Sequence, residues 1–149
     1  MKPINEMKLT FLSRSANESF ARAAVAAFAA QLDPAVDELA DLRTAVSEAV
    51  TNAIVHGYRD TPETGSIAIT VSILAGRAVK IEIKDKGCGI PDVGQARQPL
   101  YTTDAAGERS GMGFTVMESF TDGVRVSSKP GKGTTVTMVK VLSELDIST

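Results

Sequence analysis

The fold is decided by one stretch, Asp37-Glu-Leu-Ala-Asp-Leu-Arg-Thr-Ala-Val-Ser-Glu-Ala-Val-Thr-Asn-Ala-Ile-Val-His56. Its apolar residues recur at helical spacing, which predicts a helix with one face in a core. They are Leu39, Leu42, Val46, Ala49, Val50 and Ala53. Glu48 and Asn52 are four residues apart, so both side chains lie on the opposite face, one turn apart. A carboxylate can accept a proton from a hydroxyl group, and an amide oxygen is a ligand that suits Mg²⁺. By itself, this pair fits an ordinary solvated helix face better than a site.

The composition is that of one globular domain. The chain has 149 residues, 43% hydrophobic and 23% charged, with a net charge of −2. This length is enough for a core of its own. No basic cluster of the kind that binds nucleic acid is visible, no apolar run can span a bilayer, and the one cysteine, Cys88, cannot form an internal disulfide. We therefore expect a single cytoplasmic domain over residues 1–149, without direct contact to nucleic acid or membrane.

The hydrophobic patterns of the whole chain predict an α+β fold of two layers. Ser15 and Glu18 have the spacing of a capping box and start a helix before the central one. Strands are expected at residues 7–12, 67–73, 79–83, 124–128 and 134–142, and helices at about 15–31, 37–56 and 114–120. Residues 91–112 have no periodicity and are expected to form a lid over a site. The order predicts a two-layer sandwich, with a mixed, mainly antiparallel sheet and the helices on one face.

Two segments outside the central helix add candidate ligand-binding residues. Asp85-Lys-Gly-Cys-Gly89 ends a predicted strand. Gly87 and Gly89 let a backbone approach a ligand closely, and the Asp85 carboxylate can accept a hydrogen bond from an amino group such as that of adenine. In the last predicted hairpin, Gly131-Lys-Gly-Thr134 forms the turn, and the Thr134 hydroxyl can hold the Asp85–ligand arrangement. Each segment alone fits an ordinary turn.

A third segment, Gly107-Glu-Arg-Ser-Gly-Met-Gly113, leads directly into a predicted helix. Free N–H groups at a helix N-terminus bind anions, and Gly111 and Gly113 allow phosphate oxygens to approach. Arg109 can add a charge-assisted contact to a phosphate. Alone, this segment equally fits a flexible loop. Neither common nucleotide fingerprint, G-x-x-x-x-G-K-[ST] or G-x-G-x-x-G after a strand, is present.

Together and in this order, the four segments resemble the N, G1, G2 and G3 boxes of the GHKL ATP-binding superfamily, which includes gyrase and the sensor histidine kinases. Within it, three further segments resemble the anti-sigma F factors of endospore-forming bacteria, which are serine kinases. They are Asn17-Glu-Ser-Phe-Ala-Arg22, Ala96-Arg-Gln-Pro-Leu-Tyr-Thr-Thr103 and Glu108-Arg-Ser-Gly-Met-Gly-Phe114. The resemblance covers nearly the whole chain and implies a Bergerat-type sandwich with a lid at about 91–112.

The resemblance also implies a function. Such proteins bind a sporulation sigma factor, keep it from RNA polymerase, and phosphorylate a serine of an anti-anti-sigma factor with Mg-ATP, as homodimers that bind ATP or ADP. The roles carried over by position are Glu48 as proton acceptor, Asn52 as Mg²⁺ ligand, Asp85 as adenine-reading carboxylate, Gly87 and Gly89 beside the nucleotide, Arg109 as lid arginine, Gly111 and Gly113 as phosphate-cradling glycines, and Thr134 as the threonine of the last box.

Other interpretations remain open. The chain can be a binding module in which nucleotide only sets the shape that captures a sigma factor, or a related kinase that controls a stress-response sigma factor. A sensor histidine kinase is disfavoured, because the one histidine, His56, ends the central helix instead of lying on a separate dimerisation helix. An ATPase fragment of such a kinase is disfavoured because no remnant coiled coil is visible. Glu18 and Arg22, four residues apart outside the apolar stripe, are either a local ion pair or a partner-binding patch.

Overall fold

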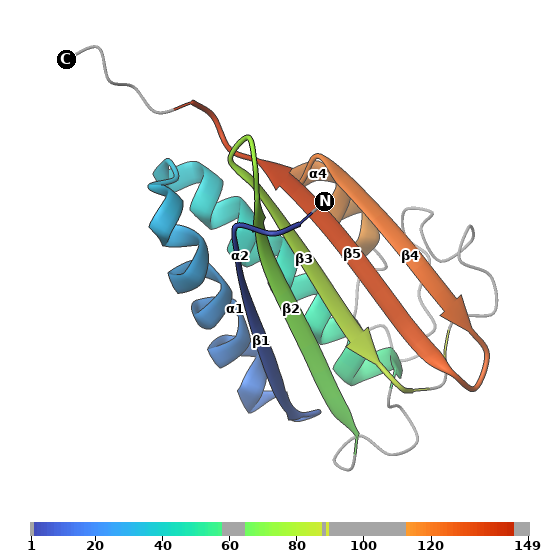
Figure 1. Cartoon of the computed structure of the whole chain (residues 1–149). Coiled ribbons are helices and arrows are strands. Elements are labelled where there is room, and N and C mark those ends of the chain that lie inside the picture. Colours follow the sequence, from blue (N-terminus) through green and yellow to red (C-terminus); the bar gives the residue numbers. More distant parts are fainter. Residues whose placement is uncertain (1, 58–64, 88, 90–112, 145–149) are drawn as a thin grey trace.

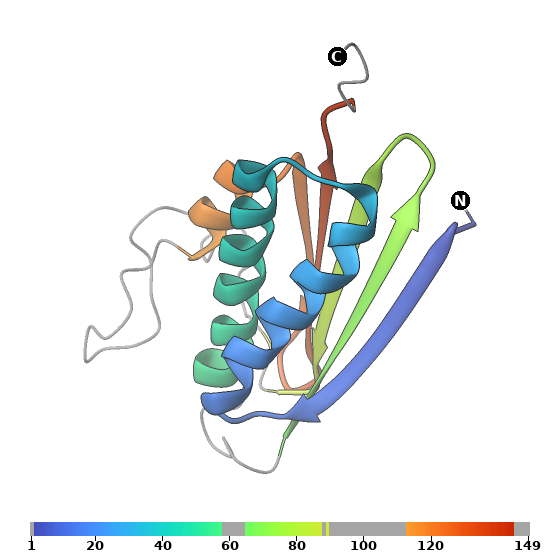
Figure 2. The same ribbon diagram turned by 90° about the vertical axis from the view of Figure 1, so that its left-hand side faces the viewer.

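The computed structural model describes residues 2–57, 65–87, 89 and 113–144, and within them one five-stranded sheet carries helices on one face (Figures 1 and 2). The elements are β1 Asn5–Leu12, α1 Ala16–Ala29, the 3₁₀ turn η1 Ala30–Leu32, α2 Val36–Asn52, the π-helical turn η2 Ala53–Gly57, β2 Ser66–Leu74, β3 Ala78–Asp85, α4 Gly113–Phe120, β4 Gly123–Lys129 and β5 Gly133–Val141. The predicted α+β two-layer sandwich is therefore confirmed. The predicted lid at 91–112 lies outside the described residues.

The sheet has the strand order β1-β2-β3-β5-β4, and every neighbouring pair of these strands is antiparallel. No parallel pair occurs in the part of the chain that the structure describes, so the sheet is more regular than the expected mixed one. Short hairpins join β2 to β3 and β4 to β5, as the alternating patterns predict. This topology puts the C-terminal residue of β3, Asp85, opposite Thr134 near the start of β5.

The core lies between the sheet and the helices α1 and α2. The stripe predicted for the central helix is buried, apart from Leu39 at its start, which is partly buried. Alternate residues of β2 and β3 cover the same core from the sheet side. Because each buried branched side chain stabilises the fold by roughly 1.5–3 kcal/mol, α2 is held in a fixed position against the strands.

The capping box predicted for the first helix is wrong. The Ser15 side chain makes no capping hydrogen bond, and Ser15 itself has helical backbone angles. The Glu18 carboxylate instead accepts a hydrogen bond from the Ser47 hydroxyl of α2. At α2, by contrast, the backbone N–H of Ala35 donates to Glu38 Oε1 at 2.9 Å. A tertiary partner for Glu18 therefore replaced the local one that the spacing suggested.

Helix α4 lies along α2 and runs in the opposite direction (Figure 2). Lys140 of β5 joins the two helices, because its Nζ lies 3.3 Å from Asp41 Oδ2 and 3.2 Å from the backbone oxygen of Phe120. Its side chain is only 12% exposed. This contact places the C-terminal end of α4 next to the first half of α2. No helix of the described residues is long and apolar enough to cross a membrane.

Candidate nucleotide-binding site

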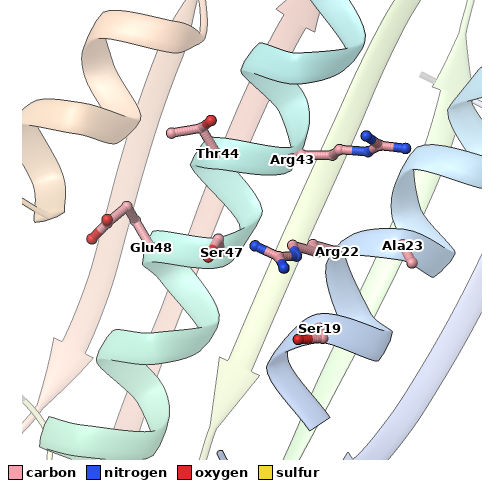
Figure 3. Close-up of a pocket in the computed structure, with 7 residues that line it drawn as sticks. All are labelled: Ser19, Arg22, Ala23, Arg43, Thr44, Ser47 and Glu48. Carbon is pink, nitrogen blue, oxygen red and sulfur yellow. The ribbon is translucent and has the colours of Figure 1, made fainter. Parts of the chain in front are cut away.

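The first part of the candidate site is the polar face of α2. Glu48 and Asn52 are both partly buried there, and the Glu48 carboxylate points away from α1, toward the side of α2 on which α4 lies (Figure 3). Gly113 is seven residues before Phe120, and Glu48 is seven residues after Asp41. At 1.5 Å per residue, both steps span about 10 Å. Since the helices pack in opposite directions and Lys140 links Phe120 to Asp41, the N-terminus of α4 lies toward Glu48.

The second part is Asp85, the last residue of β3, which is 6% exposed. Burial raises the pKa of the Asp85 carboxyl above its usual value of 3.8, although hydrogen bonds from the backbone of Gly87 and Thr134 act in the opposite direction. The Gly87 N–H donates to Asp85 Oδ1 at 2.9 Å. A buried carboxylate held by two backbone amides is rigid, and its remaining lone pairs can accept hydrogen bonds from a ligand.

Two glycines bring the turn after β3 against the turn between β4 and β5. A Cβ atom on Gly89 would lie 2.1 Å from the backbone oxygen of Lys129, and one on Gly133 would lie 2.1 Å from that of Asp85. Both have positive φ angles, +77° and +96°, which side chains disfavour. Gly89, expected beside the nucleotide, packs on the neighbouring turn at Lys129, and Gly133 leaves room for the backbone of Asp85.

Thr134 contacts its surroundings through both its backbone and its hydroxyl. It is the Thr134 backbone that hydrogen-bonds to Asp85. The Thr134 hydroxyl instead lies 2.8 Å from the Ser128 hydroxyl, which also donates to the backbone oxygen of Gly133 at 3.0 Å. Ser128 was not among the predicted residues. Its only signal was a polar residue at a core-facing position of an alternating strand.

The two parts lie at the same end of the molecule. The turn η2, which directly follows Asn52, contacts β3 and β5, and Figure 1 shows it beside the end of β3. The structure thus brings together Glu48, Asn52, Asp85 and Thr134, with the start of α4 beside Glu48. Arg109 and Gly111 lie outside the described residues, and so do the segments that flank them in the predicted lid.

These residues fit a nucleotide with Mg²⁺ better than a metal alone. Among the described residues, no three His, Cys, Asp or Glu side chains come together as a metal site. Mg²⁺ prefers six oxygen ligands and usually takes them from one or two protein groups, phosphates and water. The single amide of Asn52 is therefore a sufficient protein ligand only when a phosphate-bearing molecule is present. Free N–H groups at the start of α4 suit such phosphates.

A groove between α1 and α2 lies next to this site. It has a volume of about 430 Å³ and is lined by Ser19, Arg22, Ala23, Arg43, Thr44, Ser47 and Glu48 (Figure 3). Arg22 reaches from α1 toward α2, and Arg43 reaches from α2 toward α1. Arg22 Nη1 lies 3.8 Å from Glu18 Oε1, and the Arg22 side chain is 47% exposed. The predicted local ion pair is therefore present but long, and Glu18 is mainly engaged with Ser47.

Sequence reasoning missed Ser47 and Arg43. Ser47 precedes Glu48 and ties α2 to α1 through Glu18. The Arg43 guanidinium makes no hydrogen bond or ion pair with the described part of the chain. Neither residue has a sequence signal, because the groove exists only once two helices are packed side by side.

Comparisons with known proteins agree with this architecture. Residues 11–140 match the family model of the histidine kinase-like ATPase domain. An anti-sigma F factor from Geobacillus stearothermophilus is 57% identical over 140 residues, which is 94% of both chains. One from Thermoanaerobacter sp. (strain X514) is 55% identical over 142 residues, 95% of this chain and 97% of the relative.

Solved structures show the same fold. The RsbU and RsbW domains of a Mycobacterium tuberculosis protein superpose with a TM-score of 0.68 over 96% of this chain and 34% of theirs, at 20% identity. This identity supports the fold alone, whereas the two relatives above are more than half identical over 94–95% of this chain. The chain therefore belongs to the anti-sigma F factor family, whose members are built on the histidine kinase-like ATPase domain.

Proposed function

We propose that this chain is an anti-sigma factor and a protein serine kinase that uses Mg-ATP. It binds a sporulation sigma factor, which withholds that factor from RNA polymerase, and it phosphorylates a serine of an anti-anti-sigma factor. The name of the relatives supports a sigma factor as partner. The observation that carries the kinase proposal is the position of Glu48 beside the start of α4, on the same helix as Asn52 and at the sheet end that holds Asp85.

When bound, Mg-ATP supplies the phosphoryl group. The Asp85 carboxylate accepts a hydrogen bond from an amino group of the base, and the Asn52 oxygen serves as a metal ligand. The free N–H groups of α4, which begins at Gly113, offset phosphate charge. Glu48 accepts the proton of the attacking serine hydroxyl. Phosphoryl transfer depends mostly on positioning and charge neutralisation, so few side chains suffice. We propose that Arg109 and Gly111 complete the phosphate site within a lid at 91–112 of a single domain.

Replacing Glu48 by Gln tests this assignment. The change keeps the size of the side chain and its hydrogen-bonding capacity but removes the proton acceptor, so phosphotransfer should fall about 10²–10⁴-fold while ATP affinity stays within about threefold. Transfer of labelled phosphate from Mg-ATP to an anti-anti-sigma protein measures the first, and calorimetry the second. Glu144→Gln removes the same charge from an exposed position after β5 and should leave both unchanged. Normal transfer by the Glu48 variant would refute the role of Glu48.

The same assay separates the alternative functions. A complex with a sigma factor that forms with nucleotide, but without any phosphoprotein, would support a nucleotide-gated binding module. Capture of a stress-response sigma factor instead of a sporulation one would indicate the related kinase. Asn52→Ala should weaken nucleotide binding in Mg²⁺ but much less in EDTA, because only the metal contact is lost. Equal losses in both buffers would remove Asn52 from the metal.

We further propose that partners contact the groove at Glu18 and Arg22. Arg22 is the exposed member of this pair, whereas Glu18 is 18% exposed and bound to Ser47. Arg22→Glu should therefore weaken capture of the partner protein at least tenfold and spare ATP binding. Arg125→Glu, which reverses an exposed charge on β4, is the matched control. Undiminished capture by the Arg22 variant would rule the patch out. We expect the active form to be a homodimer.

A further inference from the structure

We propose that Lys140 of β5 is a positioning residue for phosphoryl transfer. It holds the end of α4 against α2, and it thereby sets how far the start of α4 lies from Glu48. The inference rests on the proposed function, because that function assigns the phosphates of the nucleotide to the start of α4. Lys140 itself contacts the far end of this helix, so it acts on the reaction only through the placement of α4 on α2.

Lys140 occupies a position of β5 that faces the helices. Val136 and Met138 are buried under them, and the alternation of the strand puts Lys140 on the same side. Its side chain is only 12% exposed, and a charge in such a place is costly unless it is hydrogen-bonded. Its Nζ has one partner on each of two helices, Asp41 Oδ2 at 3.3 Å and the Phe120 backbone oxygen at 3.2 Å.

The two partners fix different features of the two helices. Phe120 is the last residue of α4, and the last carbonyl oxygens of a helix have no partner within it. A cation is favoured there by the helix dipole as well. Asp41, by contrast, projects from the first half of α2. Lys140 therefore sets the end of α4 at one defined level along α2.

Backbone contacts of the turn after α4 fasten the same end to β5. The N–H of Asp122 donates to the backbone oxygen of Val139 at 2.8 Å, and the N–H of Val141 donates to Asp122 Oδ2 at 2.6 Å. These two contacts lie on either side of Lys140 in the sequence and tie α4 to the sheet. The Lys140 side chain extends this attachment from β5 to α2.

A displacement at the Lys140 end of α4 is transmitted to the candidate site. Gly113 precedes Phe120 by seven residues, and Glu48 follows Asp41 by seven, so each step along its helix spans about 10 Å. The helices run in opposite directions (Figure 2), and α4 has only eight residues, so it moves as one rigid unit. A misplacement of about 1 Å can cost about a hundredfold in rate, which makes this spacing important for transfer.

Replacing Lys140 by Met in the full chain tests the proposal. The change keeps an unbranched apolar stem but removes both hydrogen bonds. At a temperature where the variant is folded, kcat for transfer to an anti-anti-sigma protein should fall about tenfold to a hundredfold. The KM for that protein should stay within about threefold, because the proposed partner contact at Arg22 lies on α1. A role in stability alone would leave the kcat of the folded protein unchanged.

Two further variants control this experiment. Lys140→Arg keeps the charge and the donors, so its kcat should stay within about threefold of the original. Lys8→Met removes an exposed lysine from β1 and should leave kcat unchanged. A Lys140→Met variant with the original kcat, or a Lys140→Arg variant as slow as Lys140→Met, would overturn the proposal.

Ligand affinity gives a second readout that does not depend on turnover. Adenosine can use the Asp85 side of the site but lacks the phosphates that the start of α4 would bind. Lys140→Met should therefore weaken ATP binding about threefold to tenfold and leave adenosine binding within about twofold, as measured by competition. Equal losses for both ligands would indicate general damage and refute the positioning role. If the original chain transfers no phosphate, the kinase assignment fails, whereas this comparison still tests Lys140.

Discussion

Adding one methyl group at Gly133 should damage both the stability of this protein and its nucleotide site. Gly133 has φ +96°, and a Cβ atom there would lie 2.1 Å from the Asp85 backbone oxygen and 2.7 Å from Lys86 Cα. The positive φ costs about 1–2 kcal/mol for a residue with a side chain. The overlap with backbone adds about 1–3 kcal/mol, as in other overpacked sites. Gly133→Ala should therefore lose about 2–5 kcal/mol of unfolding free energy.

Two glycines of the same hairpin are matched controls. Gly131 has φ +76° with nothing within 4 Å of its Cβ position, so Gly131→Ala carries the backbone strain alone, about 1–2 kcal/mol. Gly123 has neither feature, so Gly123→Ala should be close to neutral. With about 2–4 °C per kcal/mol for a chain of this size, thermal melts followed by circular dichroism resolve the three variants.

Nucleotide affinity separates local damage from general destabilisation. Because the overlap falls on Asp85, Gly133→Ala should also reduce ATP affinity at least tenfold at a temperature where the variant is folded, whereas Gly131→Ala should bind normally. Equal melting temperatures for these two variants would refute the close approach. Normal ATP binding by Gly133→Ala would separate Asp85 from the nucleotide. If Gly133→Ala does not fold, Gly89→Ala tests the packing of the same two turns from the β3 side, since its Cβ would lie 2.1 Å from the backbone oxygen of Lys129.

Further predictions concern two carboxyl groups and one partly buried cation. Burial raises the pKa of Asp85 in the folded protein above the usual 3.8. The original protein therefore loses stability as the pH rises from the pKa of the unfolded state through that of the folded state, whereas Asp85→Asn does not. The unfolding free energy of Asp85→Asn minus that of the original should increase across this pH window, and a difference independent of pH would contradict it. The Glu38 carboxyl behaves oppositely: burial alone would raise its pKa, but hydrogen bonds from the Ser143 and Ala35 backbone lower it below 4.5. Its stabilisation is present above that value and is lost as the pH falls through the folded pKa, so Glu38→Gln should lower the melting temperature at pH 7 but converge with the original in acid; a constant offset would refute this. Lys140→Met should cost about 1–3 kcal/mol, since two hydrogen bonds to α2 and α4 are lost, and a double-mutant cycle with Asp41→Asn that shows no coupling would contradict it.

The sequence alone determined the elements and the chemistry of the single residues. Hydrophobic periodicity is a local property, so the stripe of the central helix, the two hairpins and the helix layer on one face followed from it directly. The spacing of Glu48 and Asn52 and the glycines around Asp85 carried enough information to assign a nucleotide site by resemblance. The capping box at Ser15 failed because spacing cannot show that the Glu18 carboxylate has a partner 29 residues away.

Only the tertiary structure decided which atoms meet. It joined the Thr134 backbone to Asp85, placed the Thr134 hydroxyl against Ser128, and linked the end of α4 to α2 through a lysine from β5. It also fixed the register of β1 on β2 and of β2 on β3. The physical reason is common to all of these: such contacts join residues far apart in the chain, and no local pattern of residue types records their distance.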